Sequence, residues 1–150
     1  MADTFTQIYI YVVFAVKNRE NLITSLWEED LYKYITGIVL GKGQKLIAIN
    51  GMPDHIHLLI GMRPSCCLSD LVREIKKSSN QFVRTHSFVK SNFQWQEGFG
   101  AFSCSHSALG NTIAYITNQK AHHGIKTFKD EYVELLKEYQ LSYKDEYLFD

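Results

Sequence analysis

The order in which strand-like and helix-like segments follow one another constrains this chain more than any other feature of its sequence. Residues 5–16 are β-branched and aromatic nearly throughout, and two short apolar runs in the middle of the chain are separated by the turn-like residues 51–54. Runs of this kind predict strands, whereas apolar positions at helical spacing predict amphipathic helices. The expected strands cover residues 5–16, 45–50, 56–62 and 93–105, and the expected helices cover residues 24–40, 70–89, 111–123 and 130–139.

Capping residues support these boundaries. Thr24 and Ser69 stand at the N-cap positions of the first two helices, and Gly41 follows the first helix. The order strand, helix, strand, strand, helix, strand is the split βαβ pattern, and two further helices follow it. We therefore expect an α+β protein: a ferredoxin-like (RRM-like) antiparallel sheet with helices on one face and an appended C-terminal helix. The additional helices, a partner subunit or a nucleic acid could cover the other face.

Length and composition favour a single domain with a hydrophobic core. With 150 residues, 45% of them hydrophobic, residues 1–150 are expected to form one domain, with a core in 1–125 and an acidic helical segment in 126–150. No apolar run approaches the roughly 18 residues that span a bilayer, and the N-terminus lacks the basic start of a signal peptide. We therefore expect a cytoplasmic protein and no membrane partner. The three cysteines imply no disulfide framework.

The charge balance bears on nucleic-acid binding. Lys and Arg together number 16, as do Asp and Glu, so bulk electrostatics alone would not hold the protein on duplex DNA. Acids are concentrated in residues 130–150, which leaves the rest of the chain with a positive excess. A basic face would contact DNA phosphates, although an ordinary solvated helix surface explains the same charges. The candidates for DNA contacts are the basic residues of the second expected helix, Arg73, Lys76, Lys77 and Arg84.

A histidine pair opens the third expected strand. Because side chains alternate across a strand, His55 and His57 project from the same face and can share one metal ion. Structural histidines are the alternative for such a pair. Leu59 stands where histidine-triad nucleotide hydrolases carry another histidine, and the adjacent cysteines lack the spacing of a zinc finger. These two familiar histidine sites are therefore disfavoured.

A polar stripe on the third expected helix supplies a nucleophile. Tyr115 and Gln119 are four residues apart, so they lie on one helix face; a solvent-facing tyrosine is the alternative. A phenol attacks phosphate poorly at neutral pH unless a divalent cation polarises the phosphodiester. The amide oxygen of Gln119 is a reasonable third ligand beside the two histidines, with open positions for phosphate oxygens and water, as Mg²⁺ or Mn²⁺ requires. Tyr115 would then lie beside the bound phosphate.

Four segments together resemble one known family. They are residues 12–19 (VVFAVKNR), 53–59 (PDHIHLL), 95–102 (WQEGFGAF) and 115–123 (YITNQKAHH). They look like the motifs of the single-tyrosine HUH transposases of small bacterial insertion sequences, of the insertion sequence 200/605 type. The resemblance runs through residues 1–125, with the motifs in the expected order.

The resemblance implies a DNA transposase that cuts and rejoins single-stranded DNA at the ends of its element through a 5′-phosphotyrosine, and that recognises hairpins near those ends. It implies His55 and His57 as metal ligands, Gln119 as the third ligand and Tyr115 as the nucleophile. It further implies a homodimer in which the tyrosine helix of one subunit completes the histidine site of the other. Two other functions stay open: a domesticated endonuclease that acts on repeated hairpins, and a non-catalytic module that binds single-stranded nucleic acid.

Overall fold

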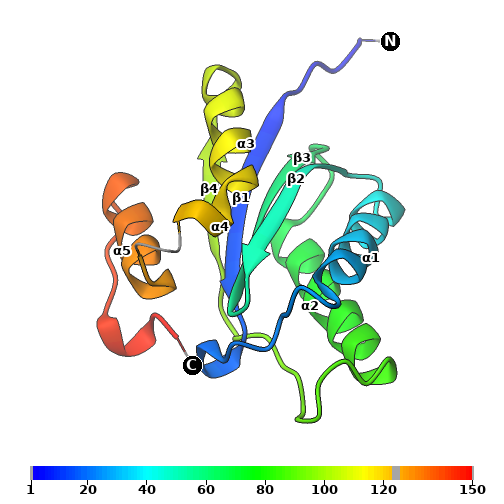
Figure 1. The fold of residues 1–150 in the computed structure, drawn as a ribbon. Coiled ribbons are helices and arrows are strands. Elements are labelled where there is room, and N and C mark those ends of the chain that lie inside the picture. Colours follow the sequence, from blue (N-terminus) through cyan, green and yellow to red (C-terminus); the bar gives the residue numbers. More distant parts are fainter. Residues whose placement is uncertain (1, 123–125, 150) are drawn as a thin grey trace.

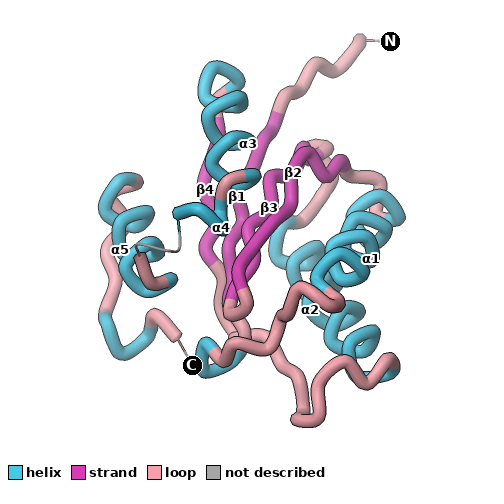
Figure 2. The backbone as a smooth tube through the Cα atoms, viewed as in Figure 1, coloured by secondary structure: helices cyan, strands magenta, loops and turns pink. Residues whose placement is uncertain are grey.

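The strands form one antiparallel sheet. The computed structural model describes residues 2–122 and 126–149 (Figure 1). The four strands, paired in the order β2-β3-β1-β4, are β1 (Ile8–Ala15), β2 (Lys45–Met52), β3 (His55–Met62) and β4 (Gly100–Cys104). The pairs β1–β3, β1–β4 and β2–β3 are all antiparallel. This is the ferredoxin-like arrangement that the sequence predicted (Figure 2).

Helices cover both faces of this sheet. Figure 1 shows on one side α1 (Glu28–Gly41) and α2 (Leu68–Thr85), and on the other side α3 (Leu109–Thr117), α4 (Gln119–His122) and α5 (Phe128–Glu138). Short 3-10 helices cover Lys17–Arg19, His106–Ala108 and Asp145–Tyr147. The sequence left open whether additional helices, a partner subunit or a nucleic acid covers the second face of the sheet. In the structure, α3, α4 and α5 of the chain itself cover it. None of the described helices has the length and apolar character needed to cross a membrane.

Alternation along β3 separates two hydrophobic cores. Ile56 and Leu58 pack with α1 and α2, whereas Leu59 packs with α3 and α5. Residues two apart on a strand share a face, so His55 and His57 lie on the same face as Leu59. The sheet therefore places the histidine pair beneath the second helix layer.

The hairpin between β2 and β3 positions the first histidine. A Cβ atom on Gly51 would lie 2.3 Å from the carbonyl oxygen of His55, so the close approach of these two strands requires glycine. The turn is also tied to neighbouring segments, because the Asp54 carbonyl accepts the amide hydrogen of Val16 at 2.8 Å and the Pro53 carbonyl accepts that of Ile23 at 2.9 Å. The strand that carries both histidines therefore starts from a restrained turn.

The first two helices differ from expectation at their ends. Helix α1 begins at Glu28 and not at residue 24, because the Thr24 carbonyl accepts the amide hydrogens of Trp27 and Glu28 in a separate turn. Helix α2 begins before Ser69, which is therefore not its N-cap, and ends at Thr85. In both cases the helix is in the predicted place, and the backbone turn at its end decides the boundary.

The last strand and the third helix differ more. Strand β4 covers only Gly100–Cys104 of the expected 93–105, and Trp95 makes an isolated bridge with Val16. The helix expected over 111–123 is divided, because Asn118 leaves the helical conformation (φ −96°, ψ 20°) between α3 and α4. Its expected end falls in residues 123–125, which lie outside the described residues.

The appended C-terminal helix is confirmed as α5. The side-chain oxygen of Thr127 accepts the amide hydrogen of Asp130 at 3.2 Å and caps the helix. Phe128, Tyr132 and Leu136 bury its apolar face in the core beneath it. The acidic segment thus contributes a helix that packs over the face of the sheet that carries the histidines.

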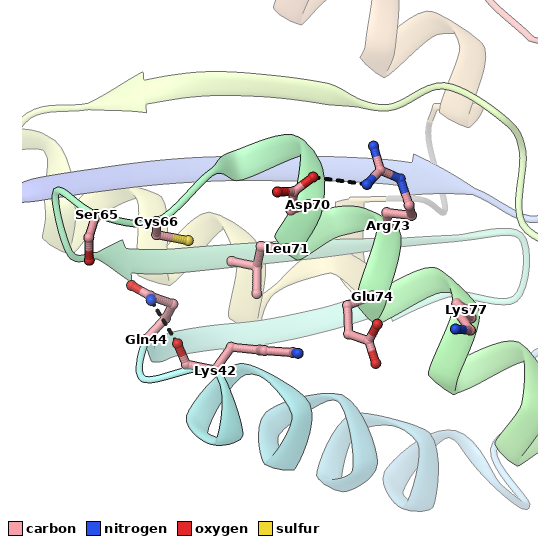
Figure 3. A pocket seen from close by; sticks show the side chains of 9 residues that line it. All are labelled: Lys42, Gln44, Ser65, Cys66, Asp70, Leu71, Arg73, Glu74 and Lys77. Atoms are coloured by element: carbon pink, nitrogen blue, oxygen red, sulfur yellow. Dashed lines mark hydrogen bonds and ion pairs between the residues drawn. The ribbon is translucent and has the colours of Figure 1, made fainter.

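A cavity of about 400 Å³ lies beside α2, in the other helix layer (Figure 3). Its lining mixes both charges, with Lys42, Arg73 and Lys77 near Asp70 and Glu74. Arg73 donates a hydrogen bond to Asp70 at 2.9 Å. The positive charge of this cavity is therefore partly compensated by its own lining.

Candidate metal and tyrosine site

Two imidazoles form the base of a buried site. The side chains of His55 and His57 are fully buried, and their ring centroids lie 4.9 Å apart. Nδ1 of His55 is hydrogen-bonded to Asp54 Oδ1 at 2.6 Å, and Nδ1 of His57 is hydrogen-bonded to the Tyr11 hydroxyl at 2.5 Å. Such partners on Nδ1 orient an imidazole so that Nε2 can bind a metal ion.

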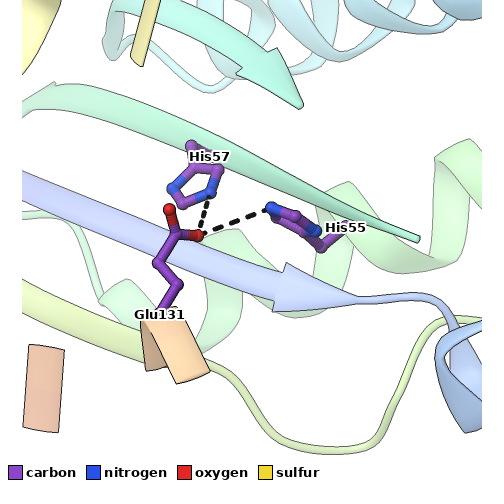
Figure 4. Close-up of side chains that lie close together, drawn as sticks. All are labelled: His55, His57 and Glu131. Carbon is purple, nitrogen blue, oxygen red and sulfur yellow. Dashed lines mark ion pairs between the residues drawn. The ribbon is translucent and has the colours of Figure 1, made fainter. Parts of the chain in front are cut away.

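A carboxylate from α5 faces both imidazoles. Oε1 of Glu131 lies 2.9 Å from Nε2 of His57 and 3.5 Å from Nε2 of His55 (Figure 4). The three ligand atoms lie within 4.8 Å of one another, and all three residues are buried. We call His55, His57 and Glu131 the His–Glu cluster. Imidazole nitrogens and a carboxylate oxygen form a donor set that suits a divalent cation, so the cluster is a candidate metal site.

Burial and charge act in opposite directions on His55. Burial disfavours the imidazolium form, but the hydrogen bonds and charges of Asp54 and Glu131 outweigh it, so the pKa of His55 is raised above its usual value. A buried carboxylate is costly unless it is paired. The cluster therefore favours positive charge at its centre, whether that charge is on an imidazole or on a metal ion.

Tyr115 projects from α3 into the same site. Its hydroxyl donates a hydrogen bond to Oε2 of Glu131, and its ring lies edge-on to that of His57 with the centroids 6.1 Å apart. Burial is the largest cause that raises the pKa of Tyr115, and the hydrogen bond and charge of Glu131 raise this pKa further. A cavity of about 390 Å³ between α3 and α5 is lined by Tyr115, Glu131 and Glu134. The tyrosine predicted from the sequence thus lies beside the predicted histidines.

Gln119 lies one helical turn after Tyr115. Its side chain is fully buried, and its Nε2 donates to the Tyr115 carbonyl at 3.4 Å. The break at Asn118 puts the two residues in consecutive helices, α3 and α4, where one helix was expected. Gln119 stays close to the nucleophile candidate, and its role as a metal ligand stays a prediction.

Glu131 is the member of the site that sequence reasoning missed. The sequence places Glu131 among the acids of residues 130–150, most of which are exposed. A local signal was present, however, because Glu131 occupies the same helical face as Phe128 and Tyr132, which are buried. An acid on the apolar face of an amphipathic helix needs a buried partner, and here the partners are the two histidines.

Two of the four basic candidates for DNA contacts bind backbone carbonyl groups of the segment before β4, and a third, Arg73, bonds to Asp70. Lys76 Nζ donates to the carbonyl oxygens of Gln96 and Gly98 at 2.8 and 2.7 Å. Arg84 Nε donates to the carbonyl oxygen of Phe93 at 3.1 Å. These cations therefore hold the irregular segment that precedes β4, since they bond to its carbonyl groups at Phe93, Gln96 and Gly98.

The other two, Arg73 and Lys77, line the cavity shown in Figure 3. All four belong to α2, which packs on the face of the sheet opposite to the His–Glu cluster. The structure therefore brings the catalytic candidates together on one face of the sheet, while Arg73, Lys76 and Lys77 line a cavity on the opposite face. DNA contacts by α2 stay a prediction.

The match to a family model decides where this chain belongs. The model described as "Transposase IS200 like" matches residues 4–119, a range that includes His55, His57, Tyr115 and Gln119. The chain belongs to the IS200-like transposase family. The match ends before α5, so Glu131 lies outside the residues that the family model matches.

One curated relative is the ISDra2 transposase TnpA of Deinococcus radiodurans. It is 27% identical over 73 residues, which make up 49% of this chain and 52% of the relative. The similarity thus spans about half the length of that protein.

Two solved structures share the fold of this IS200-like family member. A putative transposase from Deinococcus radiodurans has a TM-score of 0.65 at 22% identity, over 79% of this chain and 95% of that chain. A REP-associated tyrosine transposase bound to a REP hairpin has a TM-score of 0.61 at 20% identity, over 83% of this chain and 75% of that chain. Both support the sheet order and helix placement described above.

Proposed function

We propose that this IS200-like transposase cuts and rejoins single-stranded DNA at insertion-sequence ends, with Tyr115 as the nucleophile and a 5′-phosphotyrosine as the covalent intermediate. The observation that carries the proposal is the hydrogen bond from Tyr115 to Glu131, whose other oxygen faces Nε2 of both histidines. A phenol next to a candidate metal site is suited to attack on a phosphodiester.

The residues of the site fit a divalent metal ion. His55 and His57 direct Nε2 toward one centre, with each Nδ1 held by a second partner, and Glu131 adds a carboxylate oxygen. We propose Mg²⁺ or Mn²⁺ as the cofactor, held by the two histidines, with Glu131 or Gln119 as the third ligand. Such an ion supplies electrophilic activation of the scissile phosphate.

The protein's own groups direct the attack. The Tyr115 oxygen forms a bond to phosphorus while the bond from phosphorus to the 3′ oxygen breaks, which leaves a 5′-phosphotyrosine and a 3′-hydroxyl. The phenol proton leaves along the hydrogen bond to Glu131, and the departing 3′ oxygen takes up a proton from solvent. Attack by the 3′-hydroxyl of another end reverses these steps and joins the strands without ATP.

For the substrate we propose single-stranded DNA that carries a hairpin. This chain shares its fold with the transposase that was solved bound to a REP hairpin. Arg73, Lys76, Lys77 and Arg84 are the proposed backbone contacts, of which Arg73 and Lys77 are the more available. We further propose that residues 1–150 act as one domain, in a homodimer, in the cytoplasm.

Covalent trapping tests the proposal. Purified protein, Mn²⁺ or Mg²⁺ and a single-stranded oligonucleotide with the element's own end should give a protein–DNA adduct that survives denaturing electrophoresis. Tyr115→Phe should lose the adduct, and Tyr147→Phe, which changes an exposed tyrosine, should keep it. An adduct that persists in Tyr115→Phe would refute the assignment. His57→Ala should abolish cleavage but spare hairpin binding, because different groups carry the two functions.

A domesticated endonuclease that acts on repeated hairpins is the second candidate, and the hairpin-bound relative favours it. Its chemistry would be the same, so the flanking DNA separates the two: hairpins at both borders of the gene indicate a mobile element, and scattered copies indicate a domesticated enzyme. A non-catalytic binding module would instead bind DNA equally with and without divalent metal and form no adduct.

A further inference from the structure

Tyr11 of β1 is a buried tyrosine that the proposed reaction does not use. It is only 5% exposed, and its hydroxyl is hydrogen-bonded to Nδ1 of His57 at 2.5 Å. We propose that Tyr11 is a positioning residue, which holds the His57 ring with Nε2 toward the metal ion and thereby sets the affinity of the site for that ion. The inference rests on the proposed function for its chemistry and goes beyond it, because Tyr11 is neither a proposed ligand nor the nucleophile.

The pairing of β1 with β3 puts Tyr11 within reach of the histidine. Val13 lies directly opposite His57, and Tyr11 lies directly opposite Leu59. Tyr11 and His57 are therefore diagonal neighbours on one face of the sheet. Diagonal neighbours in an antiparallel pair are about 7–8 Å apart, a separation within reach of aromatic and long side chains. The length of the tyrosine side chain thus matches the distance to Nδ1, between two paired strands of one sheet.

Neighbouring rings fix the position of the hydroxyl. The Tyr11 ring is edge-on to His57, with the centroids 5.6 Å apart and the planes at 82°. It is also edge-on to Phe102 of β4, with the centroids 6.3 Å apart and the planes at 74°, and the same two residues are paired in the β1–β4 ladder. Because the ring is packed in the second core, the hydroxyl cannot leave Nδ1 without disturbing that core.

A phenol suits this role because it both donates and accepts hydrogen bonds. A histidine that binds a metal ion through Nε2 carries its proton on Nδ1, and the partner of Nδ1 fixes the orientation of the ring. Tyr11 can accept the hydrogen bond from Nδ1 of His57 as a neutral group, whereas His55 is held by the carboxylate of Asp54. Loss of the Tyr11 hydroxyl would therefore release one histidine and leave the other in place.

Tyr11→Phe isolates this hydrogen bond, because it keeps the ring and removes only the hydroxyl. In the variant, Nδ1 of a fully buried imidazole loses its partner, which is costly. The His57 ring can then turn toward other partners, and Nε2 no longer faces the metal position.

Titration calorimetry of the metal-free chain with Mn²⁺ tests this role without DNA. Tyr11→Phe should weaken Mn²⁺ binding by about 10–100-fold, the range for groups that orient ligands. Tyr9→Phe is the matched control, because it removes a hydroxyl from the same face of the same strand, and the Tyr9 ring lies beside His106, with the centroids 6.5 Å apart. The control should bind Mn²⁺ as the wild type does. Equal affinities of the two variants would overturn the proposal.

Two further readouts separate positioning from a general packing defect. In nitrogen-15 spectra of the metal-free protein, Tyr11→Phe should shift the Nδ1 resonance of His57 and leave that of His55 in place. In the adduct assay, Tyr11→Phe should raise the Mn²⁺ concentration that gives the half-maximal rate, and excess Mn²⁺ should restore the rate. An unchanged His57 resonance, or a rate that excess Mn²⁺ does not restore, would contradict the proposal.

The outcomes distinguish this proposal from the proposed function. If the wild type binds Mn²⁺ but forms no adduct, the proposed function fails, and the calorimetry and the nitrogen-15 spectra still decide the role of Tyr11. If the wild type binds no Mn²⁺, the role proposed for Tyr11 is overturned, whatever the adduct assay gives.

Discussion

Substitution of Gly100 tests how tightly the C-terminal helix is fitted to the sheet. A Cβ atom at this position would lie 2.8 Å from Cε1 of Tyr132, 3.0 Å from Cγ2 of Val13 and 3.2 Å from Cε2 of Phe102. None of these buried groups can move away freely, because each packs in the same core. Gly100→Ala therefore forces α5 to shift away from the sheet, and Glu131 shifts with it.

The expected cost follows from overpacking of a buried site. Inserting a methyl group in such a place destabilises by about 1–3 kcal/mol, which corresponds to a decrease in Tm of roughly 2–12 °C for a chain of this size. The matched control is Gly110→Ala in α3, where an added Cβ would meet no atom within 4 Å. That change should stabilise the helix by about 0.4–1 kcal/mol.

Urea and thermal unfolding of the two variants provide the measurement, with the rate of adduct formation as a second readout. Gly100→Ala should also cost less in a Tyr132→Val background, because removing the ring relieves part of the conflict. If Gly100→Ala were as stable as Gly110→Ala, or if its cost were unchanged by Tyr132→Val, the fit between β4 and α5 would not be as described.

Three further changes probe the site. Glu131→Gln should weaken Mn²⁺ binding by more than about tenfold, since even groups that only orient ligands contribute about 10–100-fold. Titration calorimetry with Mn²⁺ measures the affinity of this variant and of the control Glu138→Gln. Equal affinities of the two variants would exclude Glu131 as a ligand. Lys120 Nζ holds α4 against β2 and α1 through hydrogen bonds to the Gly51 carbonyl oxygen and the Glu28 carboxylate. Lys120→Met should therefore slow adduct formation roughly fivefold, equivalent to about 1 kcal/mol, with hairpin binding unchanged. Lys129→Met, at an exposed position, is the control, and equal rates in the two variants would contradict this role of Lys120. His55 has a raised pKa, so its protonation stabilises the metal-free protein fully below the unfolded value of about 6.5, and that stability is lost as pH rises through the folded pKa. The wild-type advantage over His55→Gln in urea unfolding should therefore shrink with rising pH, and a constant difference would contradict this.

Much of the site could be predicted because its chemistry is local in the sequence. A spacing of two residues along a strand puts His55 and His57 on one face, regardless of how the rest of the chain folds. A spacing of four residues keeps Tyr115 and Gln119 neighbours, even though Asn118 divides the expected helix into α3 and α4. The order of strands and helices likewise led to the ferredoxin-like sheet, since few topologies accommodate it.

Charge patterns were a weaker guide, because a cation has several ways to be satisfied. Lys76 and Arg84 suggested phosphate contacts, but in the fold they bind carbonyl oxygens of the segment before β4. That segment belongs to the strand predicted over 93–105, which Gly98 and Gly100 interrupt, and its irregular path leaves those carbonyl groups available. Sequence periodicity does not report such pairings, since they join residues on separate elements.

The sequence by itself thus determined the sheet, through the order of strands and helices along the chain, and the placement of the histidine pair and of Tyr115 with Gln119, through spacing within one strand or along one helical stretch. The tertiary structure alone decided that α5 covers the second face and that Glu131 joins the histidines and Tyr115. Such a contact depends on the side-chain volumes of distant segments, as the room left by Gly100 for Tyr132 illustrates. Local patterns show that an acid lies on a buried helix face, and only packing shows what it meets there.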